Sequence, residues 1–260
     1  MGDPRTIGEQ WGAEAQDWAT IQEPTSDPLW NAMLDATHVG KGTKFLDAGC
    51  AAGGASLLAN DRGAVITGVD VAANSIAIAT SRLPDATFKV EGIGAMTFAD
   101  ASFDAVICVN VIQFVPDVAK ALTDLVRVAK PGAKVSVAIF GPPAEVDENT
   151  VFNAIADLLP PPRPTFPEYK FSQPGKLEEL LRAAGLKDVV FAESGMPFDY
   201  PDAETGWRGQ RSAGSIQDAI EKVGEDKVHQ AVLDAFAKYR QPDGSIRMRN
   251  TMWYAPGTRP

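Results

Sequence analysis

The chain has 260 residues, of which 45% are hydrophobic and 22% charged, and its formal net charge at pH 7 is −10. This length can bury one sizeable core, and the proportions are those of a globular protein. The net charge argues against nucleic acid and anionic membranes as partners, because binding to either needs a clustered basic surface.

The N-terminal part of the chain is polar and aromatic. Residues 1–5 lack the charged-then-apolar pattern of a signal peptide, and no segment is apolar enough to span a bilayer, so the sequence predicts a cytoplasmic protein. Two polar-aromatic stretches follow, at 11–19 and 28–38. The second has apolar residues at helical spacing after Asp27-Pro28, which predicts an amphipathic helix.

Residues 43–141 alternate short apolar runs with helical patterns, which indicates a parallel sheet built from βαβ units. We expect strands at 43–48, 64–69, 87–90, 103–110 and 134–140. We expect helices at 53–60, 74–82 and 117–129. The two cysteines, Cys50 and Cys108, fall inside these elements. They are expected to be buried thiols rather than a disulfide or a metal site.

Residues 142–260 give a less regular pattern. The proline-rich segment 160–164 is expected to be irregular, and 197–214 is expected to be a polar loop. We expect helices at 175–184, 216–223 and 226–239. We expect strands at 189–192 and 246–254, the last one after a turn at Asp243-Gly244.

A glycine-rich turn, DAGCAAGG at 47–54, directly follows the first predicted strand. Such a turn lets the backbone approach a ligand closely, and the first amides of the next helix can meet an anionic group. Asp70 ends the second predicted strand, where an acidic side chain can bind two ribose hydroxyls. A nucleotide-containing cofactor is therefore expected here.

Two classes of cofactor fit this turn. Gly49, Ala51 and Gly54 match the dinucleotide spacing if alanine is allowed in the middle, so an NAD(P)-dependent oxidoreductase is one interpretation. It predicts a tyrosine–lysine pair in the core, which the sequence lacks. Asp47 puts a negative charge near the ligand, which suits an ammonium and a sulfonium better than a pyrophosphate. Bracing of the loop is the alternative role for Asp47.

Four motifs occur in order along the chain: FLDAGCAAGGA at 45–55, GVD at 68–70, FADASFD at 98–104 and VAKPG at 128–132. In this spacing they resemble the class I S-adenosylmethionine-dependent methyltransferases of the ubiquinone and menaquinone biosynthesis group. The resemblance implies a Rossmann-like, doubly wound α/β fold with a seven-stranded, mostly parallel sheet and an antiparallel last strand. It also implies a helical lid at 1–40, a cofactor-binding core at 41–141, and sheet completion with substrate-covering insertions at 142–260.

The resemblance also implies which residues contact S-adenosylmethionine. These are Asp47, Gly49, Cys50, Ala51 and Gly53 at the methionine end, Asp70 at the ribose, Val71, Ile93 and Gly94 at the adenine, and Val109 and Asn110 after the fourth strand. Two positions depart from the family, because Ala51 replaces its usual middle glycine and Ile93 its frequent acidic residue. A hydrogen bond lost at Ile93 would cost about 1 kcal/mol of cofactor binding. A catalytically silent, cofactor-binding relative is therefore an alternative.

The acceptor side gives weaker signals. Methyl transfer is an in-line displacement that depends on positioning, and some acceptors also need a general base. Gln113, where many relatives carry histidine, and His229, on the predicted helix 226–239, are the candidates, and both also suit structural roles. Aromatic residues gather in 1–40 and after the core, which makes Trp18 and Trp207, with Arg208, candidate substrate contacts. The sequence predicts methylation of a small, aromatic or polyketide-like secondary metabolite at O, N or C.

Overall fold

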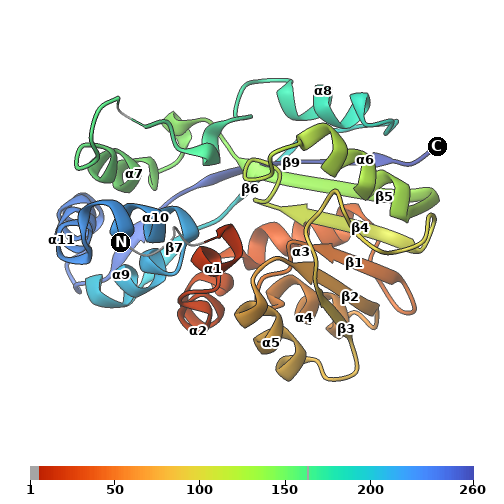
Figure 1. The fold of residues 1–260 in the computed structure, drawn as a ribbon, viewed down its shortest axis with the longest axis horizontal. Coiled ribbons are helices and arrows are strands. Elements are labelled where there is room, and N and C mark those ends of the chain that lie inside the picture. Colours follow the sequence, from red (N-terminus) through yellow and green to blue (C-terminus); the bar gives the residue numbers. More distant parts are fainter. Residues whose placement is uncertain (1–5, 163) are drawn as a thin grey trace.

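The structure is a computed structural model that describes residues 6–162 and 164–260 (Figure 1). Residues 1–5, on which the signal-peptide interpretation depends, and Arg163 of the proline-rich segment lie outside the described residues. The rest of that segment contains no helix or strand, as expected. Within the described ranges, no helix is both long and apolar enough to cross a membrane.

A seven-stranded sheet forms the centre of the molecule. Its strands are β1 (Lys44–Ala48), β2 (Val65–Asp70), β3 (Thr87–Val90), β4 (Phe103–Val109), β5 (Ala129–Phe140), β6 (Ala192–Gly195) and β9 (Thr251–Thr258). They lie in the order β3-β2-β1-β4-β5-β9-β6. Strands β1 to β5 pair in parallel, whereas β9 runs antiparallel to both β5 and β6. The predicted fold class is therefore confirmed, including the antiparallel last strand.

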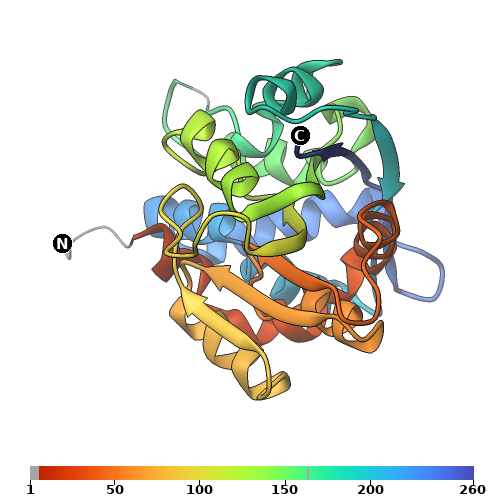
Figure 2. The ribbon, with the colours of Figure 1, turned by 90° about the vertical axis from the view of Figure 1, so that its right-hand side faces the viewer.

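Helices cover both faces of this sheet, as Figure 2 shows. They are α3 (Asp27–Ala36), α4 (Gly54–Asp61), α5 (Ala73–Arg82), α6 (Val118–Val128) and α8 (Lys176–Ala183). Successive strand residues point to opposite faces, so each strand contributes to two cores. Phe45 and Ile107 belong to the cluster that contains residues of α3 and α4, whereas Leu46 and Cys108 belong to the cluster with α6 and α8. Cys50 and Cys108 are buried free thiols, as predicted.

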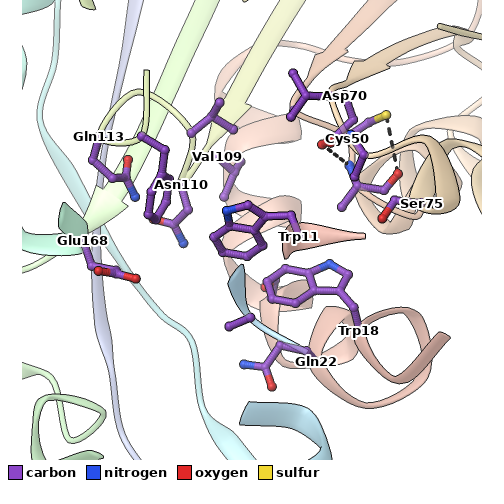
Figure 3. A pocket seen from close by; sticks show the side chains of 18 of the residues that line it. Trp11, Trp18, Gln22, Cys50, Asp70, Ser75, Val109, Asn110, Gln113 and Glu168 are labelled. Carbon is purple, nitrogen blue, oxygen red and sulfur yellow. Dashed lines mark hydrogen bonds between the residues drawn. The ribbon is translucent and has the colours of Figure 1, made fainter. Parts of the chain in front are cut away.

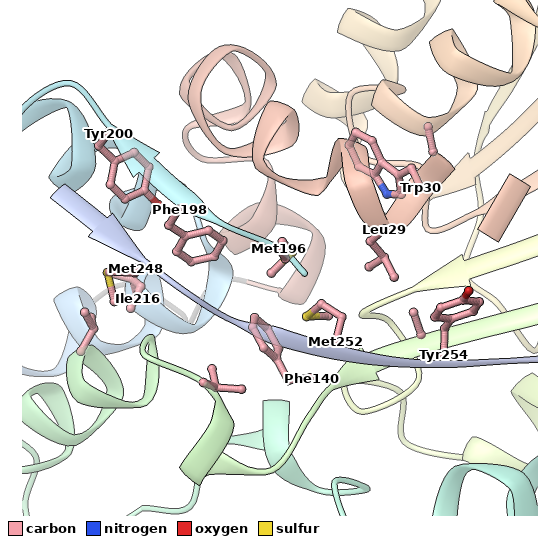
Figure 4. Packing of buried hydrophobic residues seen from close by; sticks show 14 of the residues in the cluster. Leu29, Trp30, Phe140, Met196, Phe198, Tyr200, Ile216, Met248, Met252 and Tyr254 are labelled. Atoms are coloured by element: carbon pink, nitrogen blue, oxygen red, sulfur yellow. The ribbon is translucent and has the colours of Figure 1, made fainter. Parts of the chain in front are cut away.

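A second group of elements lies beyond the carboxyl ends of the strands (Figure 1). It contains α1 (Ile7–Trp11), α2 (Ala15–Asp17), the π-helical turn Trp18–Gln22, α7 (Asn149–Ala156), α9 (Ala203–Arg211), α10 (Gly214–Val223), α11 (Glu225–Phe236) and the paired strands β7 (Phe198–Tyr200) and β8 (Ile246–Met248). Figure 4 shows that one apolar cluster runs from Leu29 and Tyr254 at the sheet to Tyr200 and Ile216 in this group. The sheet and the helical group therefore share a core.

The prediction of a loop at 197–214 is wrong, because these residues form β7 and α9. The polar residues suggested a loop, but Gly206 and Gly209 allow close helix packing. A Cβ on Gly206 would lie 2.7 Å from a ring carbon of Phe236, and one on Gly209 would lie 3.2 Å from the ring of Tyr200. Asp202 caps the helix by accepting from the amide of Thr205 at 2.7 Å, a start signal that the interpretation overlooked.

Two strand predictions near the C-terminus are also displaced. The strand expected at 189–192 begins only at Ala192, since Val190 lies opposite Pro256, which has no amide to donate back. The single strand expected at 246–254 is two strands, β8 and β9. Between them the buried Asn250 side chain accepts from the amide of Glu148 and donates to the carbonyl of Met196, which turns the chain from one sheet to the other.

Candidate active site

A cavity of about 290 Å³ lies beside the carboxyl ends of β1, β2 and β4 (Figure 3). In open α/β sheets, ligands bind at this edge, where the strand order changes direction. Here the order changes direction between β1 and β4. The cavity brings together these residues proposed from the sequence: Asp47, Gly49, Cys50, Ala51, Asp70, Val71, Ile93, Val109, Asn110, Gln113 and Trp18.

The glycine turn after β1 has a left-handed backbone at alternate positions, with φ of 84° at Gly49 and 45° at Ala51. The amides of Gly49 and Cys50 both donate to the carbonyl oxygen of Val69, at 2.7 and 3.0 Å, and so fix the turn to β2. A Cβ on Gly49 would lie 2.1 Å from Cγ2 of Val111, so the position needs glycine for space as well as for φ. Ala51 adopts its conformation at a cost of about 1–2 kcal/mol.

Two carboxyl groups stand beside this turn. Asp70 accepts from the amides of Ala51 and Ala72, at 3.0 and 2.8 Å, and thus joins the turns after β1 and β2. Asp47 is buried and accepts from the hydroxyl of Ser56 at 2.8 Å. Burial, together with the charges of Glu23 and Asp70, raises the pKa of Asp47 to about 7 against the hydrogen bond from Ser56, which lowers it. A bound cation would therefore be stabilised at this end of the cavity.

Gly53 and Gly94, which the resemblance also assigns to the cofactor, do not line the cavity. Gly53 faces α5, where an added Cβ would lie 3.2 Å from Cβ of Ala79. The amide of Gly94 donates to the carboxylate of Asp124 on α6 at 3.1 Å. Both glycines therefore pack against the helices outside the cavity and do not contact its interior.

The loops after β3 and β4 close one side of the cavity. Glu91, two residues before Ile93, lines this wall and accepts from the amide and hydroxyl of Thr97, at 3.0 and 2.6 Å. Our sequence interpretation did not single out Glu91, although an acidic residue directly after the third strand was a visible signal. Asn110 adopts a left-handed backbone, and its buried Oδ1 has no hydrogen-bond partner among the described residues.

The N-terminal helical segment covers the cavity and contributes Trp11, Trp18, Gln22 and Trp30 to its lining. We call residues 7–26 the lid. The ring of Trp11 meets Trp18 edge-on, with centroids 5.3 Å apart, and meets Phe114 of the β4 loop at 5.2 Å. Aromatic contacts therefore join the lid to the loop after β4.

Arg82 at the end of α5 fastens the lid to the glycine turn. Its guanidinium donates to the carboxylate of Glu23 at 2.6 Å and to the carbonyl oxygens of Ala19 and Ala52, at 2.8 and 2.9 Å. Glu23 is only 3% exposed, and burial raises its pKa to about 7 even though the hydrogen bond and charge of Arg82 lower it. No sequence signal pointed to this contact, since its members lie 59 residues apart.

The end of the cavity away from the glycine turn is lined by Gln113, Glu148, Glu168 and Gln210. Figure 3 shows Gln113 and Glu168 on the same side, away from Cys50 and Asp70. Gln113 is 3% exposed, and neither polar atom of its side chain has a partner in the described part of the chain. Of this set, the sequence singled out only Gln113.

A line of hydrogen bonds connects this end to the lid. Gln210 donates from Nε2 to Glu148 at 3.0 Å and to the hydroxyl of Tyr200 at 3.3 Å. The hydroxyl of Tyr200 donates in turn to Oε1 of Gln22 at 2.9 Å. All four side chains are buried, so the line fixes the position of Gln22 relative to Glu148.

Trp207, Arg208 and His229 do not line the cavity. Because 203–211 is a helix and not a loop, the buried Trp207 faces α11, with its ring centroid 4.8 Å from that of His229. Arg208 pairs with Asp17, its Nε lying 3.1 Å from Oδ2. Nε2 of His229 lies 3.3 Å from a carboxylate oxygen of Glu204. Gln210, from the same helix as Trp207, lines the cavity instead.

Comparison with known proteins identifies the family. Residues 46–137 match the family described as methyltransferase domain. Over 191 residues the chain is 31% identical to the ubiquinone biosynthesis O-methyltransferase of Pseudomonas entomophila (strain L48), an alignment that covers 71% of this chain and 82% of the relative. The chain belongs to the S-adenosylmethionine-dependent methyltransferases. The oxidoreductase interpretation is thereby set aside, and the cofactor of this methyltransferase is S-adenosylmethionine.

Further relatives agree with this assignment. The 2-methyl-6-phytyl-1,4-hydroquinone methyltransferase of Synechocystis sp. is 40% identical to this chain over 101 residues. The alignment covers 37% of this chain and 32% of that relative. The phosphoethanolamine N-methyltransferase 2 of Haemonchus contortus, solved with S-adenosyl-L-methionine, has a TM-score of 0.57 at 20% identity and covers 89% of this chain and 52% of that one. The YcgJ protein of Bacillus subtilis has a TM-score of 0.58 at 17% identity, with coverage of 88% and 97%. These two structures share the fold.

Proposed function

We propose that this methyltransferase methylates an O, N or C atom of a small, aromatic or polyketide-like secondary metabolite. The observation that supports this most directly is that one cavity extends from the glycine turn and Asp70 to a chamber lined by Trp11, Trp18, Phe114 and Phe152. A cavity with aromatic walls and a few buried polar groups suits a small, flat, apolar ligand. Relatives named for ubiquinone biosynthesis and for a hydroquinone also favour an aromatic acceptor.

The residues at the glycine-turn end of the cavity fit S-adenosylmethionine, which supplies an electrophilic methyl group on a positively charged sulfonium. We assign Asp70 to the ribose, because its carboxylate stands at the end of β2 between two turns. We assign the methionine end to Asp47, Gly49, Cys50 and Ala51, the adenine to Val71 and Ile93, and the middle of the cofactor to Val109 and Asn110. The unpartnered Oδ1 of Asn110 can accept a hydrogen bond from a donor on the cofactor. Gly53 and Gly94 have supporting roles in this assignment.

The contribution of the protein to catalysis is positioning in an apolar site. The aromatic walls and the exclusion of water would favour methyl transfer, because the reaction would neutralise the sulfonium charge. Gln113 can both donate and accept, which suits it to orient a polar group of the acceptor. His229 lies outside the cavity lining, so we assign it no part in proton transfer.

Labelled cofactor tests this proposal. The full chain is incubated with methyl-labelled S-adenosylmethionine and a panel of catechols, hydroquinones, arylalkylamines and phenolic polyketides, and we expect transfer to at least one class. Asp70→Asn should weaken S-adenosylhomocysteine binding more than tenfold, roughly the loss of a charge-assisted ribose contact. Asp61→Asn, on the exposed end of α4, is the matched control. Failure of the wild-type protein to bind S-adenosylhomocysteine would refute the assigned cofactor site.

A further inference from the structure

The charged side chains that line the cavity are all acidic. They are Asp47, Asp70, Glu91, Glu148 and Glu168, and no lysine, arginine or histidine lines it in the part of the chain that the structure describes. The first three lie at the end assigned to the cofactor, which brings its own positive charges. Glu148 and Glu168 lie at the other end, where any positive charge beside them would have to come from another molecule.

Glu168 has an unused acceptor atom. It lies in the 3-10 turn Pro167–Tyr169, and its side chain is 4% exposed. One carboxyl oxygen accepts from the hydroxyl of Ser215, whereas the buried Oε2 has no partner among the residues described. Folded proteins satisfy almost all buried polar atoms, so this oxygen points to a donor on a ligand. Burial raises the pKa of Glu168, as expected for a carboxyl group without a cation.

Glu148 places a second carboxyl group close by. It is 3% exposed and accepts from Gln210. Burial raises its pKa, and the charge of Glu168 raises it further against the hydrogen bond from Gln210. The two carboxyl groups therefore repel each other when both are ionised, and one positive charge bound between them would stabilise both.

Aromatic residues line the same cavity as this acidic pair. Phe140 and Phe152 line the cavity, and their ring centroids lie 6.1 and 5.9 Å from that of Tyr169, the residue after Glu168. Ring faces attract ammonium groups, and carboxylates among aromatic rings are a common environment for them. A hydroxyl group could satisfy Oε2 of Glu168, but it would leave the pair without a positive charge.

We propose that the acceptor carries a basic nitrogen, which binds as an ammonium group to Glu168 with Glu148 as the second negative charge. This rests on the proposed function, because it names the chemical class of the acceptor at the same site. The substrate class is an arylalkylamine or a similar aromatic molecule with an amine that is protonated at neutral pH.

Matched ligand pairs test the inference on the full chain. Isothermal titration calorimetry first measures S-adenosylhomocysteine binding, and the saturated protein is then titrated with tryptamine against tryptophol and with 2-phenylethylamine against 2-phenylethanol. Each pair differs only in an ammonium or a hydroxyl group. We expect each amine to bind roughly tenfold more tightly than its alcohol. Amines that bind no better than their alcohols, including the case in which neither binds, overturn the inference.

This outcome is distinct from failure of the proposed function. A protein that binds S-adenosylhomocysteine and methylates a phenol, but does not prefer amines, refutes only the assignment of the basic nitrogen. A protein that does not bind S-adenosylhomocysteine refutes the cofactor site itself.

Charge-removing variants assign the preference to residues. Glu168→Gln keeps the shape and an acceptor for Ser215, and it should reduce the preference for amines to roughly twofold or less. Glu148→Gln should reduce the preference for amines in part. If thermal melting shows that Glu168→Gln does not fold, the Glu148→Gln variant provides the test. Glu193→Gln, exposed on β6, is the matched control and should keep the full preference. A full preference in both cavity variants contradicts the inference.

Discussion

Replacing Arg82 by methionine should detach the lid from the glycine turn. The change removes three charge-assisted hydrogen bonds, to Glu23, Ala19 and Ala52, and leaves the Glu23 carboxyl group buried without its cation. Breaking a buried pair from one side costs about 3–5 kcal/mol. The lower end applies here, because the Arg82 side chain is 24% exposed and Glu23 can take up a proton. A loss of about 3 kcal/mol corresponds to a fall of roughly 6–12 °C in melting temperature.

The assay is thermal melting by circular dichroism, with and without S-adenosylhomocysteine. Arg62→Met is the matched control, since Arg62 is equally exposed, at 24%, and also ties α3 to α4, but its partner Asp35 is 74% exposed. An exposed pair of this kind contributes about 0–1 kcal/mol. We also expect Arg82→Met, but not Arg62→Met, to weaken S-adenosylhomocysteine binding about tenfold, because only Arg82 holds the lid.

The pH dependence sharpens this test. Without Arg82 the pKa of Glu23 rises above its value of about 7, so the carboxyl group is neutral and less costly at pH 6 than at pH 8. The deficit of Arg82→Met should therefore be smaller at pH 6. Equal losses in the two arginine variants, or a deficit that grows as the pH falls, would refute the reasoning.

Three further predictions follow from the cofactor end. Gly49→Ala should cost about 2–4 kcal/mol in thermal unfolding, because its Cβ would lie 2.1 Å from Cγ2 of Val111 at a φ of 84°, whereas Gly195→Ala, with open space around it, should cost less than about 1 kcal/mol. Ala51→Gly should stabilise the protein by about 1 kcal/mol by relieving the left-handed conformation, and a lower melting temperature would contradict this. Burial raises the pKa of Asp47 from 3.8 to about 7. Since the folded state then holds a proton that the unfolded state has released, the melting temperature of the cofactor-free protein should fall as pH rises from 4 to 7, and Asp47→Asn should flatten that slope.

The cofactor half of the molecule could be predicted because its signals are local. Each strand of the core is a short apolar run whose alternate residues reach two different clusters, and the glycine turn joins a strand to a helix within eight residues of sequence. Gly49 and Asp70 could be placed for the same reason. Gly53 and Gly94 follow the same motifs but face α5 and α6, which only the packing of those helices decides.

The end of the cavity that we assign to the acceptor could not be predicted, since its contacts are made by tertiary packing. Glu148 precedes a short helix and Glu168 lies among prolines, and neither position has a periodic pattern. They come together only because α7 and α10 pack in the helical group. Trp207 was predicted to contact the substrate but is a core residue. It was expected in a loop, whereas Gly206 and Gly209 allow α9 to pack closely, Gly206 against Phe236.

The way in which the chain leaves and re-enters the main sheet has a consequence for how such enzymes diversify. Gly195 at the end of β6 lies opposite Thr251 at the start of β9, and Phe198 lies opposite Met248 in the short ribbon that follows. The whole excursion from 196 to 250 therefore starts and finishes at neighbouring points, and it supplies Met196, Phe198, Gln210 and Ala213 to the cavity. An exchange of this excursion between homologues would alter the wall that meets the acceptor and leave the donor-binding turns untouched. The segment 196–250 could thus be exchanged through two junctions that are neighbours in space, without a change to the turns after β1 and β2.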